Sequence, residues 1–398
     1  MATRTITTDV AIFGGGVAGL WALNLLRSEG YSVLLFEEDT LGSAQTISSQ
    51  GIIHGGTKYA LGGLPTPASE SIAAMPSVWR DCLAGHGPVD LRGCRLLSEG
   101  CHLWSTGSAG GRLAGFLASQ LLRGSVVILQ PDEYPVPLRH PDFRGRVYHL
   151  SDPVLDVPSL LATLASPHSE VIFKIDWRTA ALHAMDGLAS LTLPGARLEA
   201  RCILLTAGSG NEALLKSLDA RGPAMQRRPL QQVLVRHEYE ESLFGHCIGH
   251  RPSPRLTISS HRTSDDQPVW YLGGDLATAG AEAPPDRLIR NARQELEAVL
   301  PWINLGNSQW RTLTLDRAEP RQAALRRPDT AFVEAVDGVE NALVGWPGKM
   351  TLAPRLGEAV LDALRQRNIR PRHQPDLSAL AALPRPDIAA PHWERGFA

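Results

Sequence analysis

A glycine-rich turn between a short apolar strand and a helix constrains the fold of this chain more than any other feature. Residues 9–13 are apolar and β-prone, and Gly14-Gly15-Gly16-Val17-Ala18-Gly19 follow them directly. A segment with leucines on one helical face comes next, and a second apolar strand is expected at 32–36. Together they form a β-α-β unit of about 30 residues. The pattern predicts a Rossmann-like α/β fold with a parallel sheet.

The spacing of the glycines in this turn indicates a dinucleotide site. Gly14 is expected to make the tight turn, Gly16 to let the backbone approach a pyrophosphate, and Gly19 to let the helix lie close to the sheet. Val17 and Ala18 would open the helix, where unpaired N–H groups and the helix dipole favour negative charge.

Acidic residues at the end of the second strand extend this prediction. Glu37 and Glu38 follow the turn by about 20 residues, where a carboxylate can accept hydrogen bonds from ribose hydroxyls. A carboxylate there would repel a 2′-phosphate, which argues against NADP. NAD and FAD share the adenosine half that such a turn recognises, so the turn by itself does not choose between them.

Later segments predict a second, mainly antiparallel sheet. A helix is expected to open near residues 154–161, with Asp156 or Ser159 as a possible cap. Two more helices are expected at 286–300 and 351–366. Strands are expected at 171–175, 179–183, 188–193, 202–206, 231–236, 256–259 and 269–272.

Composition excludes several classes of function. The chain has 398 residues, of which 43% are hydrophobic and 20% charged, and its formal net charge is -2. This balance does not favour nucleic acid or an acidic membrane as a partner. Because no run of about 18 apolar residues occurs, and the N-terminus lacks the apolar core of a secretory signal, we expect a cytoplasmic protein without a transmembrane segment. Five cysteines without a Cys-x-x-Cys pair predict reduced thiols and no metal site.

Three further segments favour FAD through a resemblance to a known family. Residues 48–59, Ser-Ser-Gln-Gly-Ile-Ile-His-Gly-Gly-Thr-Lys-Tyr, resemble the Ser-Ser-Lys-Leu-Ile-His-Gly-Gly-Leu-Arg-Tyr segment of FAD-dependent glycerol-3-phosphate dehydrogenases. Residues 204–210 resemble the strand and turn that return to the adenosine half in these flavoproteins. Residues 348–354 are similar to the family's Gly-Lys-Leu-Thr-Thr stretch, and to a run in the wider D-amino-acid-oxidase-like (glutathione-reductase-type) superfamily.

The resemblance implies a division of the chain and a set of cofactor contacts. It implies an FAD-binding domain at 1–65, 150–215 and 330–370, a substrate domain at 66–149 and 216–329, and a Pro-rich tail at 371–398. The turn at 14–19 and the carboxylates Glu37 and Glu38 belong to this set of cofactor contacts. The other residues implied to hold FAD are Ser48, Ser49, Gln50, Thr179, Ala207, Gly208, Gly348, Lys349, Met350 and Thr351.

Physical reasoning supports the last of the three segments. Thr351 is a plausible N-cap, and Pro354 would fall in the first helical turn, where its missing N–H costs little. The helix N-terminus would then aim partial positive charge at the flavin edge where reduction builds negative charge. Lys349 could add a full charge, or could be an exposed cap residue.

The implied reaction is hydride transfer to flavin N5 from a carbon that bears OH or NH. His54 is the first candidate for the proton acceptor; alternatively it only hydrogen-bonds the flavin or the loop. Lys58, which stands where the family has arginine, could hold a substrate anion or be a solvated loop lysine. Arg317 or Arg321 could clamp a carboxylate or phosphate, unless each forms a surface ion pair.

Two departures from the family affect the expected substrate. Gln232 stands where glycerol-3-phosphate dehydrogenases place a histidine, and the chain lacks their extra C-terminal helical domain. We expect a dehydrogenase or oxidase of a small anionic alcohol, such as a 2-hydroxy acid or a polyol phosphate, with an amine or amino acid as the alternative. The electron acceptor could be oxygen, quinone or a protein.

The Pro-rich tail leaves a further alternative open. Residues 371–398 could form a surface strap, a partner contact or a loose segment. If the tail docks on a partner, the chain could be a flavoprotein subunit whose catalytic role depends on that partner.

Overall fold

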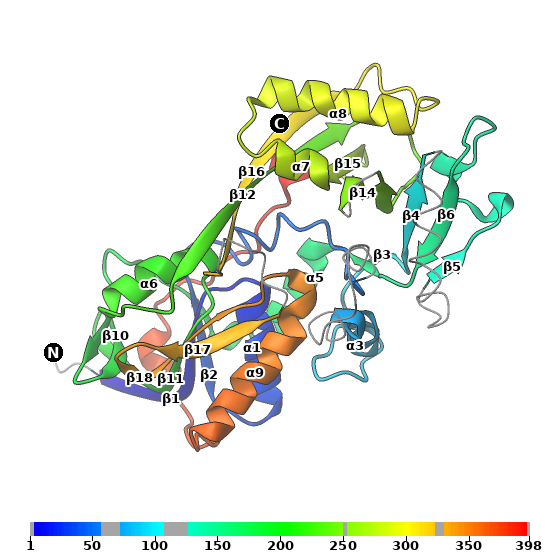
Figure 1. Ribbon diagram of the computed structural model, residues 1–398. Helices are drawn as coiled ribbons and strands as arrows, with labels where there is room; N and C mark the ends of the chain where they lie inside the picture. Colours follow the sequence, from blue (N-terminus) through cyan, green and yellow to red (C-terminus); the bar gives the residue numbers. More distant parts are fainter. Residues whose placement is uncertain (1–3, 57–71, 107–125, 250–252, 323–329, 396–398) are drawn as a thin grey trace.

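The computed structural model describes residues 4–56, 72–106, 126–249, 253–322 and 330–395 (Figure 1). Its first sheet has the strand order β17-β18-β11-β1-β2-β8, and the hairpin β9–β10 extends it beside β11. The strands from β18 to β8 in this order run parallel. Their bounds are β1 Arg4–Phe13, β2 Val33–Glu37, β8 Ile172–Lys174, β9 Ala181–Met185, β10 Leu188–Leu193, β11 Ala196–Leu205, β17 Phe332–Val336 and β18 Val339–Trp346.

Helices cover this parallel sheet, which explains why β2 and the second halves of β1 and β11 are almost continuously apolar. Helix α1 (Val17–Ser28) packs between α9 (Ala353–Gln366) and α5 (Val157–Ala165), as Figure 1 shows for α1 and α9. Trp21 of α1 is fully buried against Trp79 of α3 (Met75–Leu83), with ring centroids 4.8 Å apart. The main hydrophobic core therefore lies around β1 and α1.

The second sheet has the order β16-β12-β15-β14-β13-β4-β6-β5 and is antiparallel except where β13 meets β4. Helices α7 (Asp275–Ala279) and α8 (Pro285–Val299) pack on it. The strand bounds are β4 Cys101–Ser105, β5 Val126–Ile128, β6 Arg146–Leu150, β12 Met225–Arg236, β13 Gly245–Ile248, β14 Pro254–Arg262, β15 Pro268–Gly273 and β16 Gln309–Pro320. A short pair, β3 (Leu96–Ser98) and β7 (Val154–Leu155), lies apart from both sheets.

A long two-stranded ribbon connects the two sheets. Strands β12 and β16 pair over their whole lengths, from Met225 opposite Pro320 to Arg236 opposite Gln309. Figure 1 shows the ribbon running from the second sheet down to the first. Residues in the middle of the ribbon therefore lie between the two sheets.

The expected α/β fold with a second, mainly antiparallel sheet is confirmed. Strand β10 has the predicted bounds, and α8 and α9 lie within two residues of theirs. Strand β11 is longer than predicted because its first half, Ala196–Arg201, alternates charged and apolar residues that pair with β1 and β10. Of the two candidate caps, Asp156 is the residue that caps α5, because its side chain accepts a hydrogen bond from Ser159 N.

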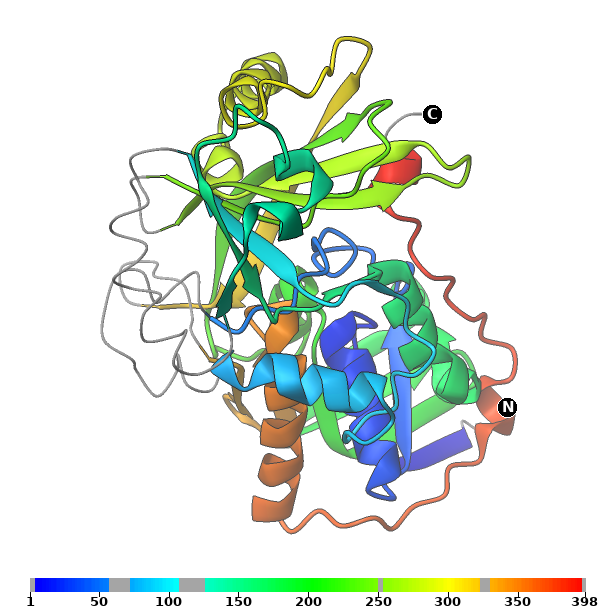
Figure 2. The ribbon, with the colours of Figure 1, turned by 90° about the vertical axis from the view of Figure 1, so that its right-hand side faces the viewer.

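After α9, the chain runs along one side of the molecule and ends beside the second sheet. We call residues 370–395 the C-terminal segment; its last helix is α10 (His392–Arg395). Figure 2 shows it passing from the foot of α9 up to that sheet. One of the three predicted possibilities, a surface strap, therefore describes its course.

Further features bear on the class of protein. Among the described residues, no helix has the length and apolar character needed to cross a membrane, and no cluster of three or more His, Cys, Asp or Glu side chains could hold a metal ion. Cys82, Cys94, Cys202 and Cys247 are buried thiols outside any disulfide. Burial raises their pKa values to about 11 for Cys82 and Cys94 and about 12 for Cys202 and Cys247.

Candidate functional site

A cavity of about 890 Å³ lies where the two sheets approach each other. Its walls come from the carboxyl ends of β1, β2, β11 and β18, the segment 42–54, and the middle of the β12–β16 ribbon. Cavities of this size hold large ligands, and open parallel sheets bind ligands at the carboxyl ends of their strands. It is therefore the candidate site.

The glycine-rich turn has the geometry that its spacing predicts. Gly14 has a φ of +108°, and a Cβ there would lie 2.5 Å from the Ala207 Cα atom. A Cβ on Gly19 would lie 2.0 Å from the Gly14 carbonyl oxygen. Only glycine fits such close approaches. Gly14 and Gly16 line the cavity, whereas Gly19 packs behind the turn.

The N-terminus of α1 opens onto the cavity. Gly16 is the N-cap and makes no side-chain cap, while Val17 and Ala18 line the cavity. Val17 N donates to Thr46 Oγ1 at 3.1 Å, which fixes the segment 42–54 against the turn. The N-terminus of a twelve-residue helix in this setting favours an anion such as a phosphate.

Glu37 is half-buried and is hydrogen-bonded to the turn. Its Oε2 accepts a hydrogen bond from Gly15 N at 2.6 Å, and its Oε1 accepts one from Asp39 N at 3.0 Å. Burial raises the pKa of Glu37, while the hydrogen bonds from Asp39 and Gly15 oppose that rise. Glu37 and Glu38 both line the cavity, so both predicted carboxylates reach it.

The wall beyond Glu37 is only partly as predicted. Ala207 and Gly208 line the cavity, and the Gly208 carbonyl accepts a hydrogen bond from Trp346 Nε1 at 3.0 Å. Thr179 is exposed and lies outside the lining. Its place is taken by Trp177, together with Ala180, Ala181 and Leu182. The residue was misplaced because a turn precedes β9, which begins only at Ala181.

The other predicted segments also line the cavity. Ser48, Ser49 and Gln50 line it, and so do the four residues Gly348, Lys349, Met350 and Thr351. The prediction that Thr351 caps a helix is wrong. Residues Met350–Leu352 form a 3-10 turn before α9, and the Thr351 hydroxyl accepts a hydrogen bond from His54 N at 3.2 Å. Pro354 lies in the first turn of α9, as predicted.

His54 lines the cavity and lies beside a buried carboxylate. Its Nδ1 is 4.0 Å from Asp152 Oδ2, and Asp152 Oδ1 accepts a hydrogen bond from Gly55 N at 2.8 Å. The ring of His246, which is fully buried, lies 5.5 Å from the His54 ring, and its Nδ1 is 2.9 Å from Thr257 Oγ1. Sequence reasoning missed Asp152, because nothing in its Ser-Asp-Pro context distinguishes it from a loop residue.

Two of the predicted cations belong to the cavity wall. Arg317, on β16, and Lys349 both line the cavity, and Lys349 is buried. Arg321 is exposed and lies outside the lining. Lys58 falls outside the described residues.

The carboxylate of Glu319 is paired on the ribbon. Glu319 is fully buried and bonded to Arg228 through both oxygens, at 2.6 and 2.7 Å. Glu319 therefore forms an ion pair with Arg228 within the β12–β16 ribbon.

Gln232 also lines the cavity, from β12. Its Oε1 lies 2.9 Å from the hydroxyl of Tyr271, a buried residue of β15. A neutral amide in this position offers hydrogen bonds but no charge.

The chain is similar to known proteins over almost its whole length. The family described as FAD dependent oxidoreductase (DAO) matches residues 9–360. The probable FAD-dependent oxidoreductase PA4991 of Pseudomonas aeruginosa is 46% identical over 396 residues, which cover 99% of this chain and 100% of that protein.

Solved structures show the same fold. The crystal structure of the Pseudomonas aeruginosa oxidoreductase has a TM-score of 0.86 and 42% identity, with 100% of each chain covered. Glycine oxidase from Geobacillus kaustophilus has a TM-score of 0.62 and 16% identity, covering 94% of this chain and 98% of its own. Iminodiacetate oxidase from Chelativorans sp. has a TM-score of 0.65 and 17% identity, covering 93% and 98%.

Proposed function

The chain belongs to the FAD-dependent oxidoreductase (DAO) family, and from that premise we propose that it oxidises a small, carboxylate-bearing amine such as an amino acid. The observation that carries the proposal is the cavity, whose lining includes the dinucleotide turn together with Arg317, Lys349 and His54. Glycine oxidase and iminodiacetate oxidase, named for such substrates, share the fold. Their names motivate the amine class, which replaces the alcohol expected first from the sequence.

The residues present fit FAD. The α1 N-terminus, without a side-chain cap, and the turn at Gly14 and Gly16 would hold the pyrophosphate. Glu37 and Glu38 would take the adenosine ribose, with Ala207 and Gly208 beside them. The flavin would lie toward the segments 48–54 and 348–351. Bound FAD supplies a two-electron acceptor for the C–H bond next to the substrate nitrogen.

The cations of the cavity would orient the substrate. The guanidinium of Arg317 can pair with a carboxylate through two parallel hydrogen bonds. Lys349 also lines the cavity and places a second positive charge there. That charge favours an anionic substrate, and it also stabilises negative charge that develops near it.

His54 would hold the proton that the substrate gives up. An imidazole can accept a proton near neutral pH, and the Nδ1 atom of His54 lies 4.0 Å from the Asp152 carboxylate. Such a base can take a proton from an ammonium group or from a hydroxyl. The His54–Asp152 pair is therefore the observation that keeps a 2-hydroxy acid as the second candidate substrate.

The domain organisation is also part of the proposal. We propose that the chain divides into an FAD-binding part (1–65, 150–215 and 330–370) and a substrate part (66–149 and 216–329). The likeness to glycerol-3-phosphate dehydrogenases and a protein partner at the tail remain predictions.

A pair of arginine variants tests the substrate orientation. The native enzyme is first screened with amino acids, and the best substrate is then compared in Arg317→Gln and Arg321→Gln. Loss of a charge-assisted pair should raise KM about 10- to 100-fold in Arg317→Gln. Arg321 is the matched control because it is exposed and outside the cavity, so Arg321→Gln should keep the native KM. An unchanged KM in Arg317→Gln, with FAD still bound, would remove Arg317 from the substrate site.

A further inference from the structure

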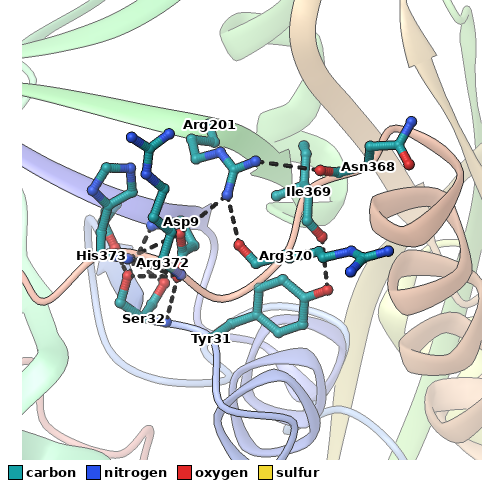
Figure 3. Close-up of polar contacts among 10 residues, drawn as sticks. Asp9, Tyr31, Ser32, Arg201, Asn368, Ile369, Arg370, Arg372 and His373 are labelled. Atoms are coloured by element: carbon teal, nitrogen blue, oxygen red, sulfur yellow. Dashed lines mark hydrogen bonds and ion pairs between the residues drawn. The ribbon is translucent and has the colours of Figure 1, made fainter.

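A buried carboxylate fixes the start of the C-terminal segment to the first sheet (Figure 3). Asp9 of β1 is fully buried, and it accepts hydrogen bonds from the backbone N–H groups of Arg372 at 3.1 Å and His373 at 3.3 Å. Ser32 donates to it from its backbone and its hydroxyl, and Arg201 Nη1 lies 3.6 Å away. A buried carboxylate is costly unless it is paired in this way, so this attachment is specific.

The middle of the segment follows the edge of the same sheet. Lys174 N on the edge strand β8 donates to the Pro384 carbonyl at 2.8 Å, and the guanidinium of Arg385 lies 4.0 Å from the centre of the Phe173 ring. Leu41 then forms a parallel β-bridge with Ile388. The segment thus covers the β8 edge and is directed toward the segment 42–54.

At its far end the segment reaches a residue that lines the cavity. His392 Nε2 lies 2.8 Å from Ser48 Oγ, and Ser48 Oγ donates its proton to the Ala44 carbonyl at 2.9 Å. Because that proton is already used, the Ser48 hydroxyl must accept from His392, which therefore carries a proton on Nε2. Burial lowers the pKa of His392, with the charges of Arg395 and Arg311 as smaller causes, which favours the neutral ring.

The neighbouring Trp393 anchors this contact on the second sheet. Its ring is buried and stacks on His261, with centroids 4.0 Å apart and planes at 20°. Tyr271, in contact with both rings, has its hydroxyl 2.9 Å from the Ser48 carbonyl and from Gln232 Oε1. Ser48 is therefore held at its side chain by the C-terminal segment and at its backbone by the second sheet.

We propose that His392 is a positioning residue of the FAD site. It fixes Ser48, and through Ser48 the cavity-lining segment 48–54, so that the C-terminal segment is a built part of the cofactor site. Loss of the His392 Nε2 donor leaves the Ser48 side chain bonded to the Ala44 carbonyl alone, and FAD must then order this side chain on binding. This inference rests on the proposed placement of FAD in the cavity.

Two substitutions of one residue separate the hydrogen bond from mere bulk. The side-chain nitrogen of Gln can reach the place of His Nε2, whereas that of Asn corresponds to Nδ1. In FAD titrations of the apoprotein, His392→Asn should raise the dissociation constant about tenfold. His392→Gln should stay within about twofold of the native value. Glu394→Gln is the control, because the Glu394 side chain, also on α10, accepts a hydrogen bond from the exposed Ser264, and this variant should bind FAD as the native chain does.

A double-mutant cycle tests whether His392 acts through Ser48. In a Ser48→Ala background, His392→Asn should weaken FAD binding by less than about twofold. Equal effects of His392→Asn in both backgrounds, or native FAD affinity in His392→Asn, would overturn the inference. If the native apoprotein bound no FAD, the proposed placement of the cofactor would fail instead. Thermal unfolding of each apoprotein shows that the variants are folded when they are compared.

Discussion

At the scale of residues, burial decides the charge of many histidines. Desolvation disfavours the charged imidazole and is the first cause of the shift in every case. The pKa is lowered to about 4 in His102 and His237 and to about 3 in His261, and it is also lowered in His149, His168 and His392. Burial therefore favours the neutral ring of each of these side chains in the folded protein, and each binds a proton more readily once the chain unfolds.

This difference predicts acid-sensitive stability. Below about pH 6.5 the unfolded chain binds more protons than the folded one, so stability is present above that pH and falls as the pH drops. His237→Asn should reduce the loss of unfolding free energy between pH 7 and pH 5 by about 1–2 kcal/mol. Asn can still accept the Tyr239 N–H that His237 Nδ1 accepts.

Urea unfolding at the two pH values measures this difference. His86→Asn, at an exposed position, should leave the pH dependence as it is in the native chain. The same pH dependence in His237→Asn and in the native protein would refute the role of His237.

Cavity residues could be predicted where they belong to a local sequence pattern. The turn at residues 14–19, Glu37, and the segments 48–54 and 348–351 all line or support the cavity. Asp152 could not be predicted, because its significance comes from a contact with His54, almost a hundred residues earlier in the chain. A single polar residue in a loop belongs to no periodic pattern from which such a contact could be predicted.

At the scale of elements, the approach of α1 to the sheet leaves no room for a side chain. A Cβ on Gly19 would lie 2.0 Å from the Gly14 carbonyl oxygen and 2.8 Å from Thr206 Oγ1. The backbone oxygen belongs to the turn itself, so relief requires a shift of the whole turn. The position of α1 and the shape of the turn are therefore fixed together.

Gly19→Ala should destabilise the protein by about 1–3 kcal/mol and weaken FAD binding. Gly306→Ala is a suitable control, because a Cβ there meets only the end of the Asn304 side chain, at 3.1 Å. Urea unfolding and FAD titration of both variants provide the measurement. Native stability and native FAD affinity in Gly19→Ala would contradict the close packing of α1.

Element boundaries were predictable where one periodicity dominates. The helices α8 and α9 and the strand β10 show clear patterns, and their predicted bounds are close to the observed ones. Strands β4, β5 and β6 were not predicted individually, because they are short and their pairing depends on distant partners such as β13. The full length of β12 was missed, since Arg227, Arg228 and Pro229 interrupt its apolar pattern.

At the scale of the whole molecule, the two sheets are connected twice across the cavity. The β12–β16 ribbon extends from the second sheet toward the first, and the C-terminal segment connects them through Asp9 at one end and Trp393 at the other. The Pro-rich composition of this segment indicated an extended chain but not its course. That course depends on single contacts with residues far away in sequence, which composition does not encode.

The proposed function requires that this cavity binds FAD and that the cations lining the cavity select a carboxylate-bearing amine. An anaerobic titration of the purified protein, followed by visible absorption, tests it with the matched compounds alanine, lactate and ethylamine. We expect flavin absorption bands that alanine bleaches at a far lower concentration than ethylamine does, because ethylamine has the amine but no carboxylate. Bleaching by lactate alone would move the assignment to a 2-hydroxy acid, and equal bleaching by alanine and ethylamine would contradict the role of the cations.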